Sequence, residues 1–163
     1  MEYVIFLAEK QDCSIKVRAC ANGSTQREYT SNDEATSPTV SAEAVMIRGV
    51  IDANQGRDAI TADIPNAFVQ TAIDHKKGQD RITMNIKCHL IDILNEISPE
   101  TYNKYITLEN EQRMPYVMMR KTLYRILISA VLLYKKLRKE LERIGFKVNL
   151  YDVCVASIIL NQS

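Results

Sequence analysis

The sequence has 163 residues and a formal net charge of +1, a size that predicts one domain with a hydrophobic core. Hydrophobic residues make up 46% and charged residues 25% of the chain, which is ordinary for a globular protein and excludes an intrinsically disordered chain. The apolar run at residues 3–8 is too short for a membrane span and follows no basic segment, so we expect an intracellular protein of the cytoplasm or nucleus, neither secreted nor bound to a membrane.

The first third of the chain predicts a hairpin, a loop and a helix. Residues 3–8 and 15–21 are apolar runs with high β propensity separated by polar residues, which is typical of a β-hairpin. Residues 22–37 are rich in Ser, Thr and Asn and predict a loop. Ser41 is a good N-cap for a helix that carries an apolar stripe and ends near Gly56.

The rest of the chain predicts short strands interleaved with helices. Residues 59–64 alternate as a strand, and residues 71–80 are polar and predict a loop. The further expected elements are strands at 81–86, 115–119 and 155–160 and helices at 89–96, 99–105 and 128–144. Strands interleaved with helices, with a hairpin at the start, predict the α+β class.

The end of the third predicted strand carries the most informative motif of the sequence. Alternation places Asp63 on the face opposite the apolar residues, and Pro65 ends sheet pairing because it has no N–H donor. Asn66 and Ala67 then offer backbone N–H groups in a turn, an arrangement that holds phosphates, and the aromatic Phe68 follows. This order of residues is typical of a polymerase metal site. In the simpler alternative, Asp63 caps a turn and Phe68 belongs to the core.

Several motifs, in chain order, resemble those of copia-type retrotransposon reverse transcriptases. The segment from Asp63 to Phe68 resembles the first catalytic motif of these enzymes. Lys16-Val17-Arg18, followed by Gly23 and Gln26, resembles the fingers segment of the family. Further resemblances to later motifs of the family lie at residues 33–40, Leu123, Tyr124, Ser129, Tyr134, Gly145, Phe146 and residues 151–155. The resemblance implies one incomplete domain, with partial fingers at about 1–58 and a partial palm with inserted helices at about 58–163.

The resemblance also implies a reaction, a cofactor and a set of site residues. The reaction of the family is RNA-directed DNA polymerisation, and its partners are an RNA template, a DNA primer and a dNTP. Asp63 is the implied catalytic ligand of Mg²⁺, Asn66 and Ala67 would contact the triphosphate, and Phe68 would check the sugar. The implied nucleic-acid contacts are Lys16, Arg18 and Lys121.

The chain departs from the family pattern in ways that predict an inactive polymerase. Two-metal chemistry needs several carboxylates, and the family supplies two of them as adjacent aspartates on a later hairpin. No Asp-Asp pair occurs in this sequence, so we expect a domain truncated before that motif, with weak Mg²⁺ binding. Arg125 stands where the family has glycine, and Leu127 and Ile128 stand at its lysine and glutamine. The expected protein is therefore an inactive fragment of a retrotransposon polyprotein.

Two alternatives come from other classes. Residues 135–147 hold six basic and two acidic residues, a net charge of +4, so this basic helix predicts a non-catalytic nucleic-acid-binding or interaction module. Charge runs of this kind are also often a solvated helix face. In the other alternative the chain is not stably folded, because the hairpin that would cover its sheet edge is missing. The four cysteines lack metal-site spacing and predict reduced, packed thiols.

Overall fold

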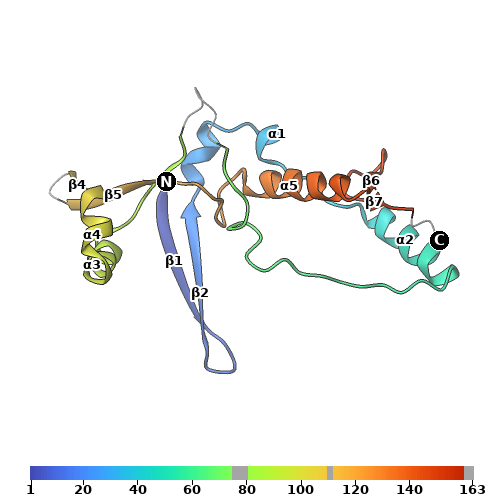
Figure 1. Ribbon diagram of the computed structural model, residues 1–163, viewed down its shortest axis with the longest axis horizontal. Coiled ribbons are helices and arrows are strands. Elements are labelled where there is room, and N and C mark those ends of the chain that lie inside the picture. Colours follow the sequence, from blue (N-terminus) through green and yellow to red (C-terminus); the bar gives the residue numbers. More distant parts are fainter. Residues whose placement is uncertain (75–80, 110–111, 160–163) are drawn as a thin grey trace.

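The computed structural model describes residues 1–74, 81–109 and 112–159. Its centre is a five-stranded mixed sheet with the strand order β2-β1-β3-β5-β4, and a two-stranded sheet pairs β6 with β7. Helices lie at both ends of the sheet, and the long helix α5 (Ser129–Arg143) runs away from it (Figure 1). This mixture of helices and a sheet confirms the α+β class that the sequence predicted.

The predicted hairpin is confirmed, and it projects from the body of the molecule (Figure 1). Strand β1 spans Glu2–Glu9 and β2 spans Ile15–Asn22, with the antiparallel register running from Glu2 opposite Asn22 to Glu9 opposite Ile15. In the connecting turn the Asp12 carboxylate accepts hydrogen bonds from the N–H and the hydroxyl of Ser14. Cys13 has a φ of 59° in this turn and is exposed, so the expectation of packed cysteines is wrong at this position.

The predicted loop at residues 22–37 contains two short helical segments, so the sequence prediction is wrong there. A 3₁₀ helix spans Ser24–Glu28, and helix α1 spans Asn32–Ala35. Helix α1 begins with a capping box in which Ser31 and Glu34 bond each other's backbone N–H groups. A capping box is readable as S-x-x-E, but the polar composition of the segment concealed it.

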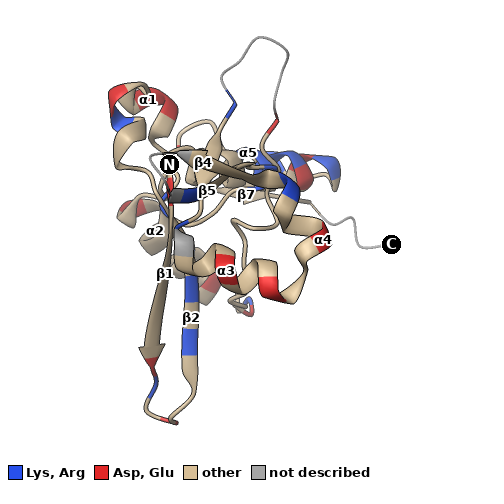
Figure 2. Cartoon of the chain, turned by 90° about the vertical axis from the view of Figure 1, so that its left-hand side faces the viewer, with Lys and Arg blue, Asp and Glu red and all other residues tan. Residues whose placement is uncertain are grey.

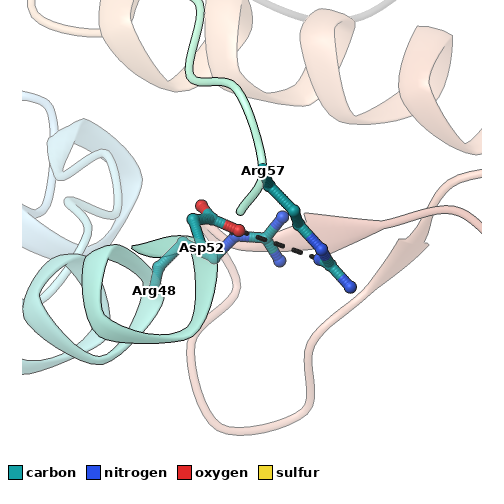
Figure 3. Close-up of polar contacts among 3 residues, drawn as sticks. All are labelled: Arg48, Asp52 and Arg57. Carbon is teal, nitrogen blue, oxygen red and sulfur yellow. Dashed lines mark hydrogen bonds and ion pairs between the residues drawn. The ribbon is translucent and has the colours of Figure 1, made fainter. Parts of the chain in front are cut away.

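Helix α2 spans Ala42–Asn54 and confirms the helix predicted from Ser41 to near Gly56. The Ser41 hydroxyl accepts a hydrogen bond from the N–H of Ala44, as an N-cap does. At the other end Gly56 adopts a φ of +60°, and Asp52 lies between Arg48 at 2.9 Å and Arg57 at 3.8 Å (Figure 3). These ion pairs fix the point where the chain leaves the helix.

The strand predicted at residues 59–64 does not form. Residues 57–64 are irregular, and the side chain of Ile60 is 92% exposed. Alternation indicates a strand only where a neighbouring strand completes the hydrogen bonds, and no strand of the described chain pairs with this segment. Asp63 therefore lies in an exposed connection and not at the end of a central strand.

The middle of the chain supplies the second half of the sheet. Strand β3 at Thr83–Asn85 pairs with β1 in parallel and with β5 in antiparallel orientation, while β4 pairs with β5 and with no other strand of the described residues. Helix α3 (Cys88–Ile97) buries Ile91 to 1% exposure. Part of the loop predicted at 71–80 lies outside the described residues. The remaining elements are α3 at Cys88–Ile97, α4 at Pro99–Tyr102, a 3₁₀ turn at Asn103–Tyr105, β4 at Ile106–Glu109 and β5 at Gln112–Met118.

The last third confirms the long predicted helix but shortens the last predicted strand. Helix α5 spans Ser129–Arg143. Gly145, whose φ is +98°, follows its C-cap residue Ile144, and the N–H of Phe146 donates to the carbonyl of Leu141. Strand β6 at Lys147–Val148 pairs with β7 at Ala156–Ser157, which is all that forms of the strand predicted at 155–160 among the described residues. The main core gathers Ala21, Ile73, Met84, Met119 and Ile126 around the sheet.

Candidate functional site

A cleft of about 690 Å³ opens between the β1–β2 hairpin and two segments from elsewhere in the chain. One wall is the hairpin, and the other is built from the turn at residues 65–70 and the loop at residues 123–126. We call it the cationic cleft. Its polar and aromatic lining consists of Lys16, Arg18, Asn66 and Arg125 with Phe6 and Tyr124.

The strand register explains why the two predicted hairpin contacts face the cleft together. Lys16 and Arg18 are two residues apart on β2 and therefore point to the same face. Phe6 pairs with Arg18 and Ala8 pairs with Lys16 across the hairpin, which puts these four side chains on one side. Figure 2 shows basic residues along β2. The hairpin therefore presents two cations and an aromatic ring as one surface.

Close backbone contacts hold the opposite loop against the base of the hairpin. The N–H of Ala21 donates to the carbonyl of Tyr124 at 3.0 Å, and the side-chain oxygen of Gln26 accepts from the N–H of Leu127 at 3.1 Å. A Cβ at Gly23 would lie 2.2 Å from the carbonyl oxygen of Arg125, so only glycine fits there. Gly23 and Gln26 are thus residues that position the loop.

Arg125 completes the cleft as a third cation. Its backbone has a φ of 70°, in the left-handed region that favours glycine, and its guanidinium carbon lies 4.8 Å from the centre of the Phe6 ring. The residue Phe6 stays 41% exposed and Tyr124 stays 40% exposed. The sequence motifs missed Phe6, Tyr124 and Arg125 as binding candidates, because only the strand register and the loop contacts bring them to Lys16 and Arg18.

The turn after Pro65 lines the cleft with Asn66 and Val69, and of these two only Asn66 was a predicted site residue. Asn66 has a φ of 53° and lines the cleft, whereas the Ala67 carbonyl accepts a hydrogen bond from the Thr71 hydroxyl at 3.0 Å. Phe68 is half-buried, and the centre of its ring lies 5.0 Å from the centre of the Tyr124 ring in an edge-on arrangement. The backbone carbonyl of Phe68 accepts a hydrogen bond from the hydroxyl of the buried Thr122 at 2.5 Å. Phe68 packs behind the cleft rather than in its lining.

The two other predicted site residues lie outside the cleft lining. Asp63 is exposed in the irregular segment, and Lys121 is exposed beside a single bridge to Ala72. Within residues 1–74, 81–109 and 112–159, no group of three or more His, Cys, Asp or Glu side chains is placed to hold a metal ion. A lone carboxylate does not fit the donor set of a catalytic Mg²⁺ pair, so the magnesium site stays a prediction from the resemblance.

Ion pairs and hydrogen bonds occupy part of the basic helix predicted at 135–147. Arg138 pairs with Glu142 at 2.9 Å, and Arg143 pairs with Glu140 at 2.8 Å. The hydrogen bond from Arg143 is the main cause that lowers the pKa of the Glu140 carboxyl below its ordinary value. The Lys136 ammonium donates to the carbonyl of Gln70 at 2.8 Å. Half of the six cations are therefore already engaged within the chain.

Asp152 takes a structural position. Its carboxylate accepts hydrogen bonds from the N–H of Ser41 at 2.9 Å, the hydroxyl of Ser41 at 3.0 Å and the N–H of Cys154 at 2.9 Å. The backbone hydrogen bonds from Ser41 and Cys154 lower the pKa of Asp152. Asp152 begins a turn in which its carbonyl accepts from the N–H of Val155 at 3.0 Å, and its side chain ties this turn to the start of α2.

No protein-family model, no curated protein and no solved structure matches this chain. None of the described helices is long and apolar enough to span a membrane.

Proposed function

We propose that this chain binds single-stranded nucleic acid in the cationic cleft, without polymerising DNA, and that it derives from the fingers and palm of a copia-type reverse transcriptase. The observation that carries the proposal is the convergence of Lys16, Arg18 and Arg125 with two exposed aromatic rings in one cleft. The lineage rests on the sequence motifs.

The chemistry of the lining suits a single strand. Cations that follow a groove neutralise successive phosphates, and aromatic rings stack with unpaired bases at about 1–3 kcal/mol per base. Phe6 and Tyr124 keep enough exposed surface for stacking, and the guanidinium of Arg125 adds a flat cationic surface above Phe6. Neither kind of contact needs a metal ion.

The motifs on which the proposed ancestry rests do not contain the set of carboxylates that a polymerase active site needs. Nucleotide addition needs two divalent ions held by several carboxylates. Asp63 is one exposed carboxylate, and the sequence contains no Asp-Asp pair. We therefore expect binding in the absence of Mg²⁺ and no primer extension.

The test compares two pairs of lysine and arginine replacements. In a titration with a single-stranded oligonucleotide, Lys16→Gln with Arg18→Gln should weaken binding about tenfold, because two phosphate contacts are lost. The matched control, Lys135→Gln with Lys139→Gln on α5, removes the same charge and should leave the affinity nearly unchanged. Equal losses would assign binding to general charge, and a loss only in the control would assign it to the basic helix.

A template-primer extension assay tests the other half of the proposal. The native chain and Asp63→Asn should both give no extension with Mg²⁺ and dNTP, while both bind the oligonucleotide equally. Extension by the native chain would contradict the proposal of a binding protein. If Asp63→Asn abolished that extension, Asp63 would be a metal ligand after all.

A further inference from the structure

Helix α2 is apolar on nearly all sides, yet it is not packed into the core. Only Glu43, Arg48 and Asp52 are charged among the residues of Ala42–Asn54, and no residue of the helix is buried. A helix with so much apolar surface normally belongs in an interior. Its exposure indicates a surface that another polypeptide covers.

One face of α2 carries no charge at all. Residues three or four apart on a helix lie on the same side, so one face of α2 holds Val45, Met46, Gly49, Val50 and Ala53. The side chains of Val45, Met46 and Val50 are 55%, 73% and 70% exposed. Arg48 and Asp52 pair with each other at one edge of this face (Figure 3), and Glu43, three residues before Met46, lies at the other edge.

The same chain carries an apolar groove of about 320 Å³. We call it the α5 groove. It runs between α5 and the segments around β6 and β7, where the Tyr134 hydroxyl donates to the carbonyl of Val153 at 3.2 Å. Its apolar lining includes Leu133, Leu137, Leu141, Val153 and Cys154. A groove of this size accommodates one row of side chains from a helix that lies across it.

The total exposed area shows how much surface is left to cover. The chain exposes 13362 Å². A compact monomer of 18.6 kDa would expose about 8,200 Å². A stable interface covers about 800 Å² on each partner. The excess, which also includes the hairpin tip and the irregular segment, is larger than the area that one partner covers in such an interface.

We propose that two copies of this chain pair with twofold symmetry, the uncharged face of α2 from each copy lying in the α5 groove of the other. An isologous interface requires that one chain carry both complementary surfaces, and this chain does. Helix α2 starts beside its own groove, since Ser37 and Pro38 line the groove and Ser41 bonds Asp152. A twofold axis at this place brings each helix to the partner's groove.

Charge favours the same pairing. Glu43, in the first turn of α2, forms no ion pair with any residue of the described chain, while the surface of α5 carries a net positive charge. The acidic first turn of one copy would therefore meet the basic helix of the other. This pairing does not depend on nucleic-acid binding by the cationic cleft.

Sedimentation velocity over a concentration series tests the pairing. The native chain should dimerise. The double variant Met46→Glu with Val50→Glu should raise the dissociation constant at least about a hundredfold, because the twofold dimer buries both side chains of each of its two copies. The matched control is Ile60→Glu, which makes the same change at a residue that is 92% exposed and outside α2. A native monomer, or a dimer unaffected by the α2 changes, would overturn the proposal.

Disulfide trapping between two differently tagged copies tests the groove itself. One copy carries Val50→Cys with Cys154→Ser, the other keeps Cys154, and both carry Cys13→Ser to remove the exposed thiol. Mild oxidation should link position 50 of the first copy to Cys154 of the second, as mass spectrometry would show. Replacing Val50→Cys by Ile60→Cys should abolish the link. Linkage between two positions 50, or equal linkage from position 60, would contradict a helix seated in the partner's groove.

Discussion

Arg125 has an unfavourable backbone conformation, and that conformation places its side chain in the cationic cleft. A φ of 70° costs an L-amino acid about 1–2 kcal/mol relative to the ordinary helical region, and glycine avoids that cost. The same conformation directs the guanidinium to the Phe6 ring and the cationic cleft. The stacking contact with Phe6 offsets part of the cost, since exposed contacts of this kind contribute about 0.5–1 kcal/mol.

Replacing Arg125 separates the two effects. Arg125→Ala loses the stacking contact and keeps the backbone cost, whereas Arg125→Gly loses both. We expect the glycine variant to be more stable than the alanine variant by about 1 kcal/mol, as measured by urea denaturation. Both variants should bind a single-stranded oligonucleotide more weakly than the native chain. An alanine variant as stable as the glycine variant would show that the loop relaxes out of the left-handed region.

At the scale of residues, the sequence motifs identified three of the six polar and aromatic residues that line the cationic cleft. Lys16, Arg18 and Asn66 were predicted and do line it. Phe6 and Arg125 were not, because nothing in a single sequence tells which β1 residue faces which β2 residue or which loop lies against a hairpin base. The register and the contact between Gly23 and Arg125 depend on tertiary packing.

At the scale of elements, the link between Ser41 and Asp152 joins the start of α2 to a turn near the end of the chain. Asp152 accepts three hydrogen bonds, and these are stronger when its carboxylate is ionised. The folded chain therefore holds the pKa of Asp152 below the ordinary value of 3.8, with the Ser41 backbone hydrogen bond as the largest cause. A group whose pKa is lowered by folding stabilises the protein above its unfolded-state pKa.

The stabilisation by Asp152 should therefore depend on pH. The free energy of unfolding of the native chain should exceed that of Asp152→Ala near neutral pH, and this difference should shrink as the pH falls below about 4. The measurement is urea denaturation of both proteins over a pH series. Asp58→Ala is the control, since no described residue donates a hydrogen bond to that side chain. A difference that persists unchanged at low pH would contradict the ionic role of Asp152.

Elements with explicit end signals were predictable. Ser41 and Gly56 bounded α2, and Gly145 ended α5, because caps are local interactions between neighbouring residues. Strands lacked such signals. The segment 59–64 has strand-like alternation but no pairing partner, whereas β4 at Ile106–Glu109 was missed and is a strand because β5 lies beside it.

At the scale of the whole molecule, the small core should be measurable in the unfolding transition. The unfolded chain of 18.6 kDa would expose about 27,000 Å², and the folded chain exposes 13362 Å². The area newly exposed by unfolding is therefore about seven-tenths of the area that a compact chain of the same mass would newly expose. The urea m-value scales with this area. At a protein concentration low enough to keep the chain monomeric, the m-value should be about seven-tenths of the value for compact domains of the same length. A full-sized m-value would mean that the monomer is more compact than described.

Composition predicted a folded globular chain, but not how open it is. A hydrophobic fraction of 46% is enough for a core, yet α2 and the hairpin tip expose much of theirs: Leu7, Ile15 and Val17 are 69%, 68% and 61% exposed. Whether apolar residues are buried within one chain or between chains depends on tertiary and quaternary packing, which residue counts do not contain.

The salt dependence of oligonucleotide binding, measured in EDTA, tests the central claim most directly. Three cations that contact a single strand predict a slope of about −2 for the logarithm of the association constant against the logarithm of salt concentration. Lys16→Gln with Arg18→Gln should reduce the magnitude of that slope by about 1.4, and Lys135→Gln with Lys139→Gln should leave it unchanged. Binding that requires Mg²⁺, or a slope that the cleft variant does not alter, would contradict the account.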